Sequence, residues 1–285
     1  MAIDERAATK TSKEAGGWYR ELGRIIDNLG SNQLPETLID GLGWFIPFEM
    51  AAIFVYRNRS RPLLVYENFE PAEAKQGVAT YIKSTYVLNP FYQAYLNGLA
   101  EGVYLMRDLA PDAFFEGDNQ KVSKISTSIT EEIGYVTDHW PKAMEELIVA
   151  VSLQGDTLAE ITLSRSHDRH GFCDEDVVRV STIFPAIAAI FRKYWINFGA
   201  SDSQASPPDS RVDDAFVNFG QSVLTERERD VAQLILRGHS SDSISRNLNI
   251  SLGTVKTHRK NAYAKLNISS QSELLSMFLQ SLRMN

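Results

Sequence analysis

The last sixty or so residues carry closely spaced helix start and stop signals, and these restrict the fold more than any other feature of the chain. Thr225 and Glu228 form a capping box, in which the hydroxyl and the carboxylate each accept a hydrogen bond from a backbone N–H at the start of a helix. Gly238 provides a stop, and Asn249, which tolerates left-handed dihedral angles, provides a turn. The spacing predicts four short helices within residues 224–279, the middle two forming a helix-turn-helix.

The third of these helices divides its side chains between two faces. Four residues at helical spacing are expected to point toward the other helices: Val255, His258, Ala262 and Leu266. The opposite face carries two lysines and a threonine, with an arginine beside them: Lys256, Thr257, Lys260 and Arg259. Lysine can donate to guanine O6 and N7, threonine can contact a base edge, and the cations displace counterions from phosphates. This face predicts DNA binding, with an ordinary solvated helix face as the alternative.

The same stretch resembles the LuxR-type, or GerE-like, helix-turn-helix family. The resemblance rests on five motifs in order: LTERE at Leu224–Glu228, Gly238, IS at Ile250–Ser251, TVKTH at Thr254–His258 and KL at Lys265–Leu266. It covers the last quarter of the chain and departs at Gln271, where the family often has a basic residue. The resemblance implies that Lys256, Thr257 and Lys260 lie near bases, and that three residues lie near phosphates: Thr254, Arg259 and Arg246.

The net charge of −7 is unevenly distributed along the chain. Residues 221–285 contain nine Lys and Arg against five Asp and Glu, so this segment carries +4 and residues 1–220 carry −11. The basic charge therefore lies where phosphates would be met. The single cysteine, Cys173, excludes an intrachain disulfide, and the sequence shows neither a signal peptide nor an apolar run long enough to span a membrane. These features predict a cytoplasmic protein whose partner is double-stranded DNA and not a membrane.

The preceding two hundred residues alternate helical and strand patterns. Helical periodicity is expected around residues 14–29, 34–44, 71–86, 121–133 and 174–197. Strands are expected at Met50–Tyr56, Leu63–Glu67, Val103–Met106, Glu146–Leu153 and Thr157–Ser164. Five strands among helices predict an α+β fold with an antiparallel sheet flanked by helices. The arrangement resembles the GAF-like sensor domains often found ahead of this helix-turn-helix.

Three segments are expected along the chain. Residues 1–199 form the GAF-like sensor or ligand-binding domain. Residues 200–218 form a flexible linker, because they are rich in Ser, Pro and Asp and lack apolar periodicity. Residues 219–285 form an all-α, four-helix DNA-binding domain.

The segment YVLNPFYQAY at Tyr86–Tyr95 resembles part of another family. Acyl-homoserine-lactone receptors line their pocket with a similar tyrosine and Asp-Pro segment, and the spacing from Asn89 to Tyr104 is similar to that family's spacing between the aspartate and a pocket tryptophan. Asn89 and Tyr104 stand where that family has the charged aspartate and the tryptophan. The resemblance therefore implies the general sensor fold rather than the lactone.

Aromatic residues are dense in this stretch and upstream of it, as in a pocket for a small, largely apolar or aromatic ligand. Eight residues are candidates for ligand contact: Tyr86, Asn89, Phe91, Tyr92, Tyr104, Trp44, Tyr56 and Tyr66. Core packing is the alternative for these side chains. If these side chains only form the core, the protein would be a regulator without a small-molecule ligand. A protein partner, or its own abundance, would then control its activity.

His167 and His170 lie three residues apart after a strand, where a hydrolytic enzyme or a metal site could use them. No further ligand at suitable spacing accompanies them, so a solvated loop is the better interpretation and the enzyme remains the alternative of another class. We expect no catalytic residue, no metal and no cofactor.

The hypothesis from sequence is a transcriptional regulator that senses a small-molecule effector and acts with the transcription machinery. A homodimer is expected, because a single four-helix module meets only one half-site. Its main contact is expected on one of two apolar helical stripes, Trp18–Leu29 or Ile183–Tyr194.

Overall fold

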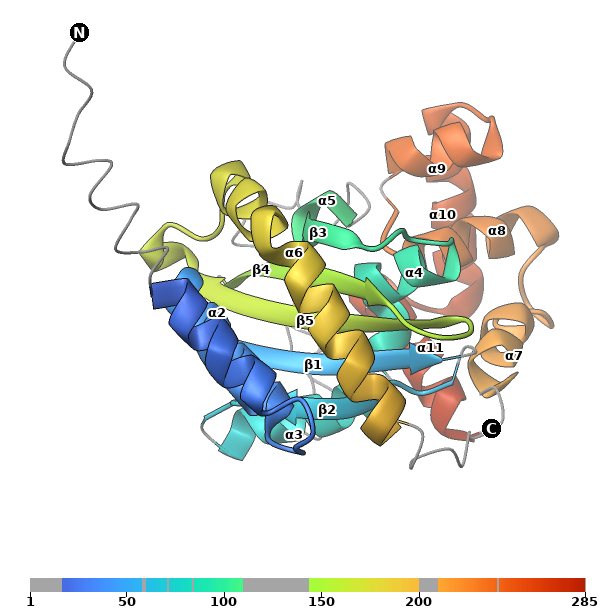
Figure 1. Cartoon of the computed structure of the whole chain (residues 1–285). Helices are drawn as coiled ribbons and strands as arrows, with labels where there is room; N and C mark the ends of the chain where they lie inside the picture. Colours follow the sequence, from blue (N-terminus) through green and yellow to red (C-terminus); the bar gives the residue numbers. More distant parts are fainter. Residues whose placement is uncertain are drawn as a thin grey trace, which may run out of the picture.

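The computed structural model describes residues 17–57, 60–70, 72–83, 85–109, 144–199, 210–239 and 241–284. Figure 1 shows a sheet with helices on both faces and a separate group of helices, α7 to α11, beside it. The helix expected over 121–133 and the start of the expected linker, 200–209, lie outside the described residues. Among the helices that are described, none is long and apolar enough to cross a membrane.

The sheet has five strands in the order β2-β1-β5-β4-β3, and every neighbouring pair is antiparallel. The strands are β1 (Met50–Arg57), β2 (Leu63–Glu67), β3 (Gly102–Leu105), β4 (Met144–Ser152) and β5 (Thr157–Ser166). Gly155 turns the chain between β4 and β5 with a φ of +71°, which glycine adopts without strain. The predicted antiparallel sheet is therefore confirmed, and β1–β2 and β4–β5 form hairpins within it.

One face of the sheet is apolar and is covered by α2 (Leu34–Phe45) and α6 (Asp174–Tyr194), which cross it in Figure 1. Because side chains alternate along a strand, every second residue of β1, β4 and β5 meets these helices. The residues from the strands are Ala51, Ile53, Val55, Leu147, Val149, Val151, Ala159, Ile161 and Leu163. Helix α6 continues through Pro185 for 21 residues and buries its predicted stripe, including Ile187 and Phe191.

The opposite face of the sheet is covered by α3 (Ala72–Lys83), the short helix η1 (Thr85–Leu88) and α4 (Pro90–Leu96). Asn89 begins α4, because its side-chain oxygen accepts a hydrogen bond of 2.7 Å from the Phe91 N–H. Beyond α4, β3 runs directly into the single turn of α5 (Met106–Leu109). The side chains on this face include hydroxyls and a carboxyl as well as aromatic rings.

Five helices form the C-terminal module: α7 (Ser210–Asn218), α8 (Glu226–Leu236), α9 (Ser241–Leu248), α10 (Leu252–Leu266) and α11 (Gln271–Met284). Residues 200–218 were expected to form a flexible linker, but Ser210–Asn218 form the helix α7. Its Phe216 is buried, and the Phe216 and Phe278 ring centroids lie 4.4 Å apart. Apolar contact with α11 therefore makes α7 an additional helix of the module. Buried apolar residues of the module and of the sheet face beneath α3 and α4 belong to one continuous cluster.

Candidate DNA-binding surface and sensor site

Helix α10 has a capping residue at each end. The Ser251 hydroxyl accepts from the Thr254 N–H at 3.0 Å, and Asn267 ends the helix in the left-handed conformation. Asn249, in the turn before it, also has a positive φ, +52°. Val255, Ala262 and Tyr263 are buried against the other helices. The expected inward face is confirmed for Val255 and Ala262, and Tyr263 is an inward residue that the sequence pattern did not single out.

The opposite face of α10 presents its polar residues to solvent. Lys256, Thr257 and Lys260 are exposed, and so is Thr254 in the first turn. The Thr257 hydroxyl donates to the Gly253 carbonyl at 2.9 Å, which fixes its rotamer and leaves oxygen lone pairs and a methyl group to the outside. Two ammonium groups and a methyl-bearing hydroxyl on one exposed helix face suit the edges of bases in a major groove.

The two arginines expected near phosphates have partners within the chain. Arg246 of α9 pairs with Asp242 at 2.7 Å, and both side chains are exposed. The Arg259 guanidinium lies 5.3 Å from the centre of the Tyr263 ring. An exposed pair of this kind contributes little to stability, so Arg246 can exchange Asp242 for a phosphate at small cost.

A hydrogen bond between Lys265 and Glu228, which the sequence did not predict, connects α10 to α8. Glu228, 4% exposed, accepts from the Thr225 N–H at 2.9 Å, which confirms the predicted capping box. The same carboxylate oxygen accepts from the Lys265 ammonium at 2.7 Å. The hydrogen bond from Lys265, followed by that from Thr225, holds the pKa of Glu228 below its usual value. One carboxylate therefore caps α8 and fixes its position relative to α10.

In the N-terminal domain, four of the residues expected to contact a ligand come together. Tyr56, on the sheet, lies with its ring centre 5.6 Å from that of Phe91 and 5.7 Å from that of Tyr92. Tyr86 packs edge-on against Tyr92 at 4.9 Å. All four side chains are buried. The aromatic convergence predicted for this stretch thus exists between β1, η1 and α4.

A chain of hydrogen bonds runs through these aromatic side chains. Asn89 Nδ2 donates to the Tyr81 hydroxyl at 3.0 Å, the Tyr81 and Tyr56 hydroxyls lie 2.5 Å apart, and Tyr56 donates to Glu160 Oε2 at 2.5 Å. Glu160 is 2% exposed, and its burial raises its pKa to about 8. Burial and the nearby Glu160 raise the pKa of the Tyr56 hydroxyl as well. Glu160 was not among the expected site residues, although its carboxyl is the end point of the network.

Three expected ligand residues lie elsewhere. Trp44 is 58% exposed, and Tyr66 packs with the cluster beneath α2 and α6, where burial, Glu36 and Asp40 raise its pKa. Tyr104 is partly buried against the apolar cluster on the face of α3 and α4, and its hydroxyl donates to the Ala100 carbonyl at 3.0 Å. Trp44 and Tyr66 therefore lie away from the aromatic group, and their contact with a ligand stays a prediction.

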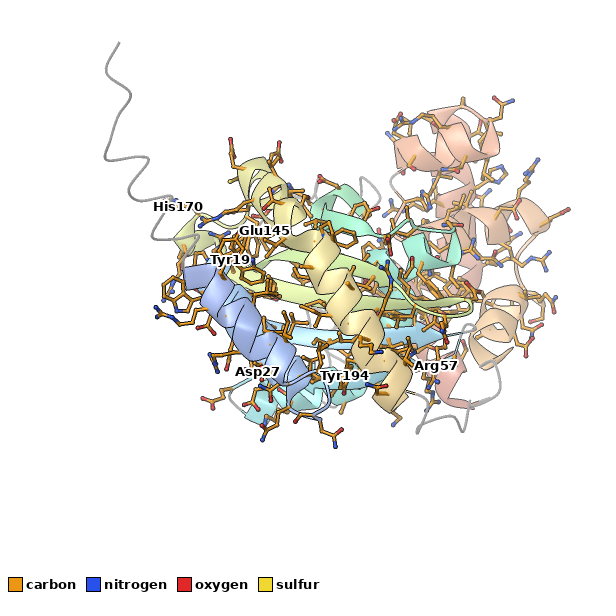
Figure 2. The ribbon with its side chains drawn as sticks, in the orientation of Figure 1. Tyr19, Asp27, Arg57, Glu145, His170 and Tyr194 are labelled. Carbon is orange, nitrogen blue, oxygen red and sulfur yellow. The ribbon has the colours of Figure 1, made fainter. Side chains whose placement is uncertain are left out.

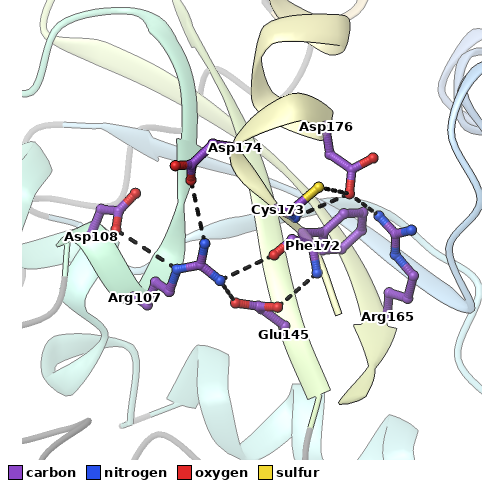
Figure 3. A network of polar contacts seen from close by, with 8 residues as sticks. All are labelled: Arg107, Asp108, Glu145, Arg165, Phe172, Cys173, Asp174 and Asp176. Carbon is purple, nitrogen blue, oxygen red and sulfur yellow. Dashed lines mark hydrogen bonds and ion pairs between the residues drawn. The ribbon is translucent and has the colours of Figure 1, made fainter. Parts of the chain in front are cut away.

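The polar network in Figure 3 ties β4 and α5 to the start of α6. Arg107 donates to Glu145 and, at 3.1 Å, to the Phe172 carbonyl, and Glu145 accepts from the Phe172 N–H at 2.7 Å. Cys173, at the N-cap of α6, is exposed. Its hydrogen bond with Glu175 raises its pKa, which disfavours the reactive thiolate. The charges of this network are paired, as expected of a structural contact.

Of the two histidines weighed as an alternative site, His170 has a described side chain. His170 is exposed and lies at the end of the sensor domain that is remote from α10 (Figure 2). Within the described ranges, no three His, Cys, Asp or Glu side chains are grouped so as to hold a metal ion. The alternative of a hydrolytic enzyme gains no support from this geometry.

The C-terminal module is similar to a described family. Residues 222–278 match the family "Bacterial regulatory proteins, luxR family". The chain is 31% identical over 200 residues to an HTH-type transcriptional regulator in the exeN 3' region of Aeromonas salmonicida, covering 68% of this chain and 94% of that protein. It is 48% identical over 59 residues to the nitrate/nitrite response regulator protein NarP of Escherichia coli, which covers 21% of this chain and 27% of NarP.

The sensor domain is similar to a solved structure. The crystal structure of the VqsR LBD domain from Pseudomonas aeruginosa superposes with a TM-score of 0.50 at 23% identity, covering 65% of this chain and 99% of that one. At this identity the similarity concerns the fold alone, which is the five-stranded sheet and its covering helices.

Proposed function

Because this chain belongs to the luxR family of bacterial regulatory proteins and is a DNA-binding transcriptional regulator, we propose that α10 enters the major groove through Lys256, Thr257 and Lys260. The observation that carries this proposal is the exposure of these three side chains on one face of a helix whose other face is buried. Thr254, Arg246 and Arg259 then contact the adjacent phosphates. The contacts with bases give sequence specificity, and the contacts with phosphates position the helix.

We further propose that the N-terminal domain senses a small molecule on the sheet face beneath α3, η1 and α4. Two features support this location. The aromatic group around Tyr56 gathers on this face, and the face contains a buried carboxyl, whereas the face beneath α2 and α6 is apolar. Buried polar groups amid aromatic walls are typical of ligand sites. The contiguous apolar cluster that joins this face to α7–α11 offers a route by which a ligand alters the DNA-binding module.

The regulator is also proposed to act as a homodimer in the cytoplasm, contacting the transcription machinery from the DNA. The stripe at Ile183–Tyr194 faces the sheet, with Ile183, Ile187 and Tyr194 buried. The helix over 17–27 keeps Tyr19 and Ile26 exposed, at 69% and 49%. We therefore place the dimer contact on this first helix.

Selection of duplexes from a random library with the full-length protein tests the function. We expect enrichment of one motif with two related half-sites centred about one helical turn apart, because each subunit presents one α10. A matched selection with the double variant K256A/K260A serves as the control and should enrich no motif. If the wild-type protein also enriches no sequence, the proposed function is wrong.

A further inference from the structure

One large apolar side chain of the helix-turn-helix stays outside the core. Leu252, the first residue of α10, is 41% exposed. Its apolar neighbours in sequence differ from it, because Ile250 packs against the apolar cluster and Val255 is fully buried within it. Leu252 belongs neither to this cluster nor to the partly buried side chains around it. In the described helices α9 and α10, it is the large apolar side chain left in contact with solvent.

The position of Leu252 gives this exposure a meaning. Isolated apolar residues are common on protein surfaces and carry none by themselves. Leu252 precedes Lys256 by four residues, and Lys256 precedes Lys260 by four, so the three side chains lie along one ridge of α10. Residues four apart on a helix have Cβ atoms about 5–6 Å from one another. Leu252 therefore meets the same half-site as Lys256, which is proposed to contact bases.

The first turn of α10 is ordered in the free protein. Ser251 caps the helix by accepting from the Thr254 N–H at 3.0 Å, and the Ser251 and Thr254 hydroxyls lie 2.8 Å apart. The backbone at Leu252 is thus fixed before DNA arrives, which lowers the entropic cost of a contact. Side chains near the N-terminal end of a recognition helix are the ones that reach base edges.

Gly253 leaves this turn open beside Leu252. Among the described residues, a Cβ atom at this glycine would meet the Ser251 hydroxyl oxygen at 3.7 Å, which is ordinary van der Waals contact. Packing within the chain therefore does not require glycine here, and glycine lowers the stability of a helix relative to alanine. Its bare backbone does allow the first turn to approach another molecule closely. The Leu252 side chain is consequently uncovered next to the lysine ridge.

The chemistry of leucine selects among the four bases. An isobutyl group has no hydrogen-bond donor or acceptor, so it cannot recognise the polar edge of a base. In the major groove, thymine is the base that presents a methyl group. Contact between the leucine and this methyl removes apolar surface of both partners from water. A cytosine in the same place would instead press its amino group against an apolar side chain and leave a donor unpaired.

We propose that Leu252 contacts the C5-methyl group of a thymine in each half-site and gives the regulator a preference for thymine there. This assignment rests on the proposed entry of α10 into the major groove. It adds an apolar base contact to the polar contacts of Lys256, Thr257 and Lys260. The preference depends on a methyl group and not on hydrogen bonds, so this position distinguishes thymine from uracil.

Replacement of thymine by deoxyuridine in the selected duplex tests the proposal, because it removes the methyl group and keeps the hydrogen-bonding edge of the base. Each thymine of one half-site is replaced in turn, together with its symmetry mate, and binding of the full-length protein is measured by fluorescence anisotropy. We expect one of these replacements to weaken wild-type binding by about fourfold per half-site, as for the burial of one methyl-sized group. L252A should bind the thymine and uracil duplexes equally at that position.

Two further variants separate Leu252 from its surroundings. T257S keeps the hydroxyl that donates to Gly253 and removes the Thr257 methyl group, so it should retain the preference for thymine at the Leu252 position. V217A shortens an exposed apolar side chain of α7 and should retain this preference as well. Because Leu252 lies outside the core, L252A should unfold at the same urea concentration as the wild-type protein.

The outcomes separate this contact from the proposed function. If no uracil replacement weakens wild-type binding, or if L252A keeps the preference for thymine, Leu252 contacts no thymine methyl and the proposal is overturned. A preference that T257S removes and L252A keeps assigns the methyl contact to Thr257 and also overturns it. A protein that selects no duplex rejects the entry of α10 into the groove, and this contact with it. A selected duplex without a Leu252-dependent thymine rejects this contact alone.

Discussion

At the scale of single residues, burial changes the ionisation of a side chain, and Glu160 is the example. Glu160 occupies a strand position that alternates with Ala159 and Ile161, a pattern typical of a strand with one solvated face. The structure covers that face with α3, η1 and α4, so the glutamate is a buried acid. The sequence pattern predicts that apolar and polar residues alternate along β5. It could not show that helices from an earlier part of the chain cover the polar side of the strand.

The protonation of Glu160 should be visible in the stability of the protein. Its pKa in the folded protein, about 8, is above the value of 4.5 for an exposed glutamate, so the unfolded chain ionises first as pH rises. The folded state therefore loses stability between about pH 4.5 and 8, on the order of a few kcal/mol in total. E160Q has no such proton, and its stability relative to wild type should increase across this range.

Urea unfolding at pH 5, 6.5 and 8 measures this effect. The relevant quantity is the difference in free energy of unfolding between E160Q and wild type, because it cancels the titration of other groups. E101Q controls for loss of a carboxylate at an exposed ion pair with Arg192. A difference that stays constant from pH 5 to pH 8 would show that Glu160 is ionised in the folded protein.

Helices and strands differ in how far the sequence determined them. The signals at Thr225 and Asn249 act locally, and each has the predicted hydrogen bond or conformation. Tyr66 shows why strand predictions are weaker, because the β1–β2 register shifts between Ile53 and Phe54 and alters which face a β2 residue meets. The clustered aromatic residues predicted a site. Their spacing along the chain could not show which of them lie on the same face of the sheet.

The contact between α8 and α10 should contribute measurably to the free energy of unfolding. E228A removes the acceptor for both the Thr225 N–H and the Lys265 ammonium, and it leaves these donors unpaired. We expect a loss of about 1–3 kcal/mol in the free energy of unfolding. E226A is the matched control, because Glu226 is exposed in the same helical turn. Equal stabilities of the two variants in chemical denaturation would show that the Glu228 contact is dispensable.

At the scale of the whole molecule, the chain combines an acidic N-terminal domain with a basic C-terminal module, and an apolar cluster connects them. A single module presents one α10, so the account requires two copies on one operator. Sedimentation velocity at micromolar concentration should show a dimer of the full-length protein. Y19D and I26D, on the exposed side of the first helix, should shift it to monomer, whereas V217D, an exposed apolar residue of α7, should not. A monomeric wild-type protein, with and without DNA, would contradict the dimer.

The most direct test of the DNA-binding surface is fluorescence anisotropy of the full-length protein with its selected duplex at fixed salt. K256A and K260A should each weaken binding by about 1–3 kcal/mol if the lysine contacts a base, and the loss should be smaller on an unrelated duplex. K193A removes the same charge from an exposed position on α6 and should bind as wild type does. Wild-type affinity in both K256A and K260A would contradict the claim that this face of α10 reads DNA.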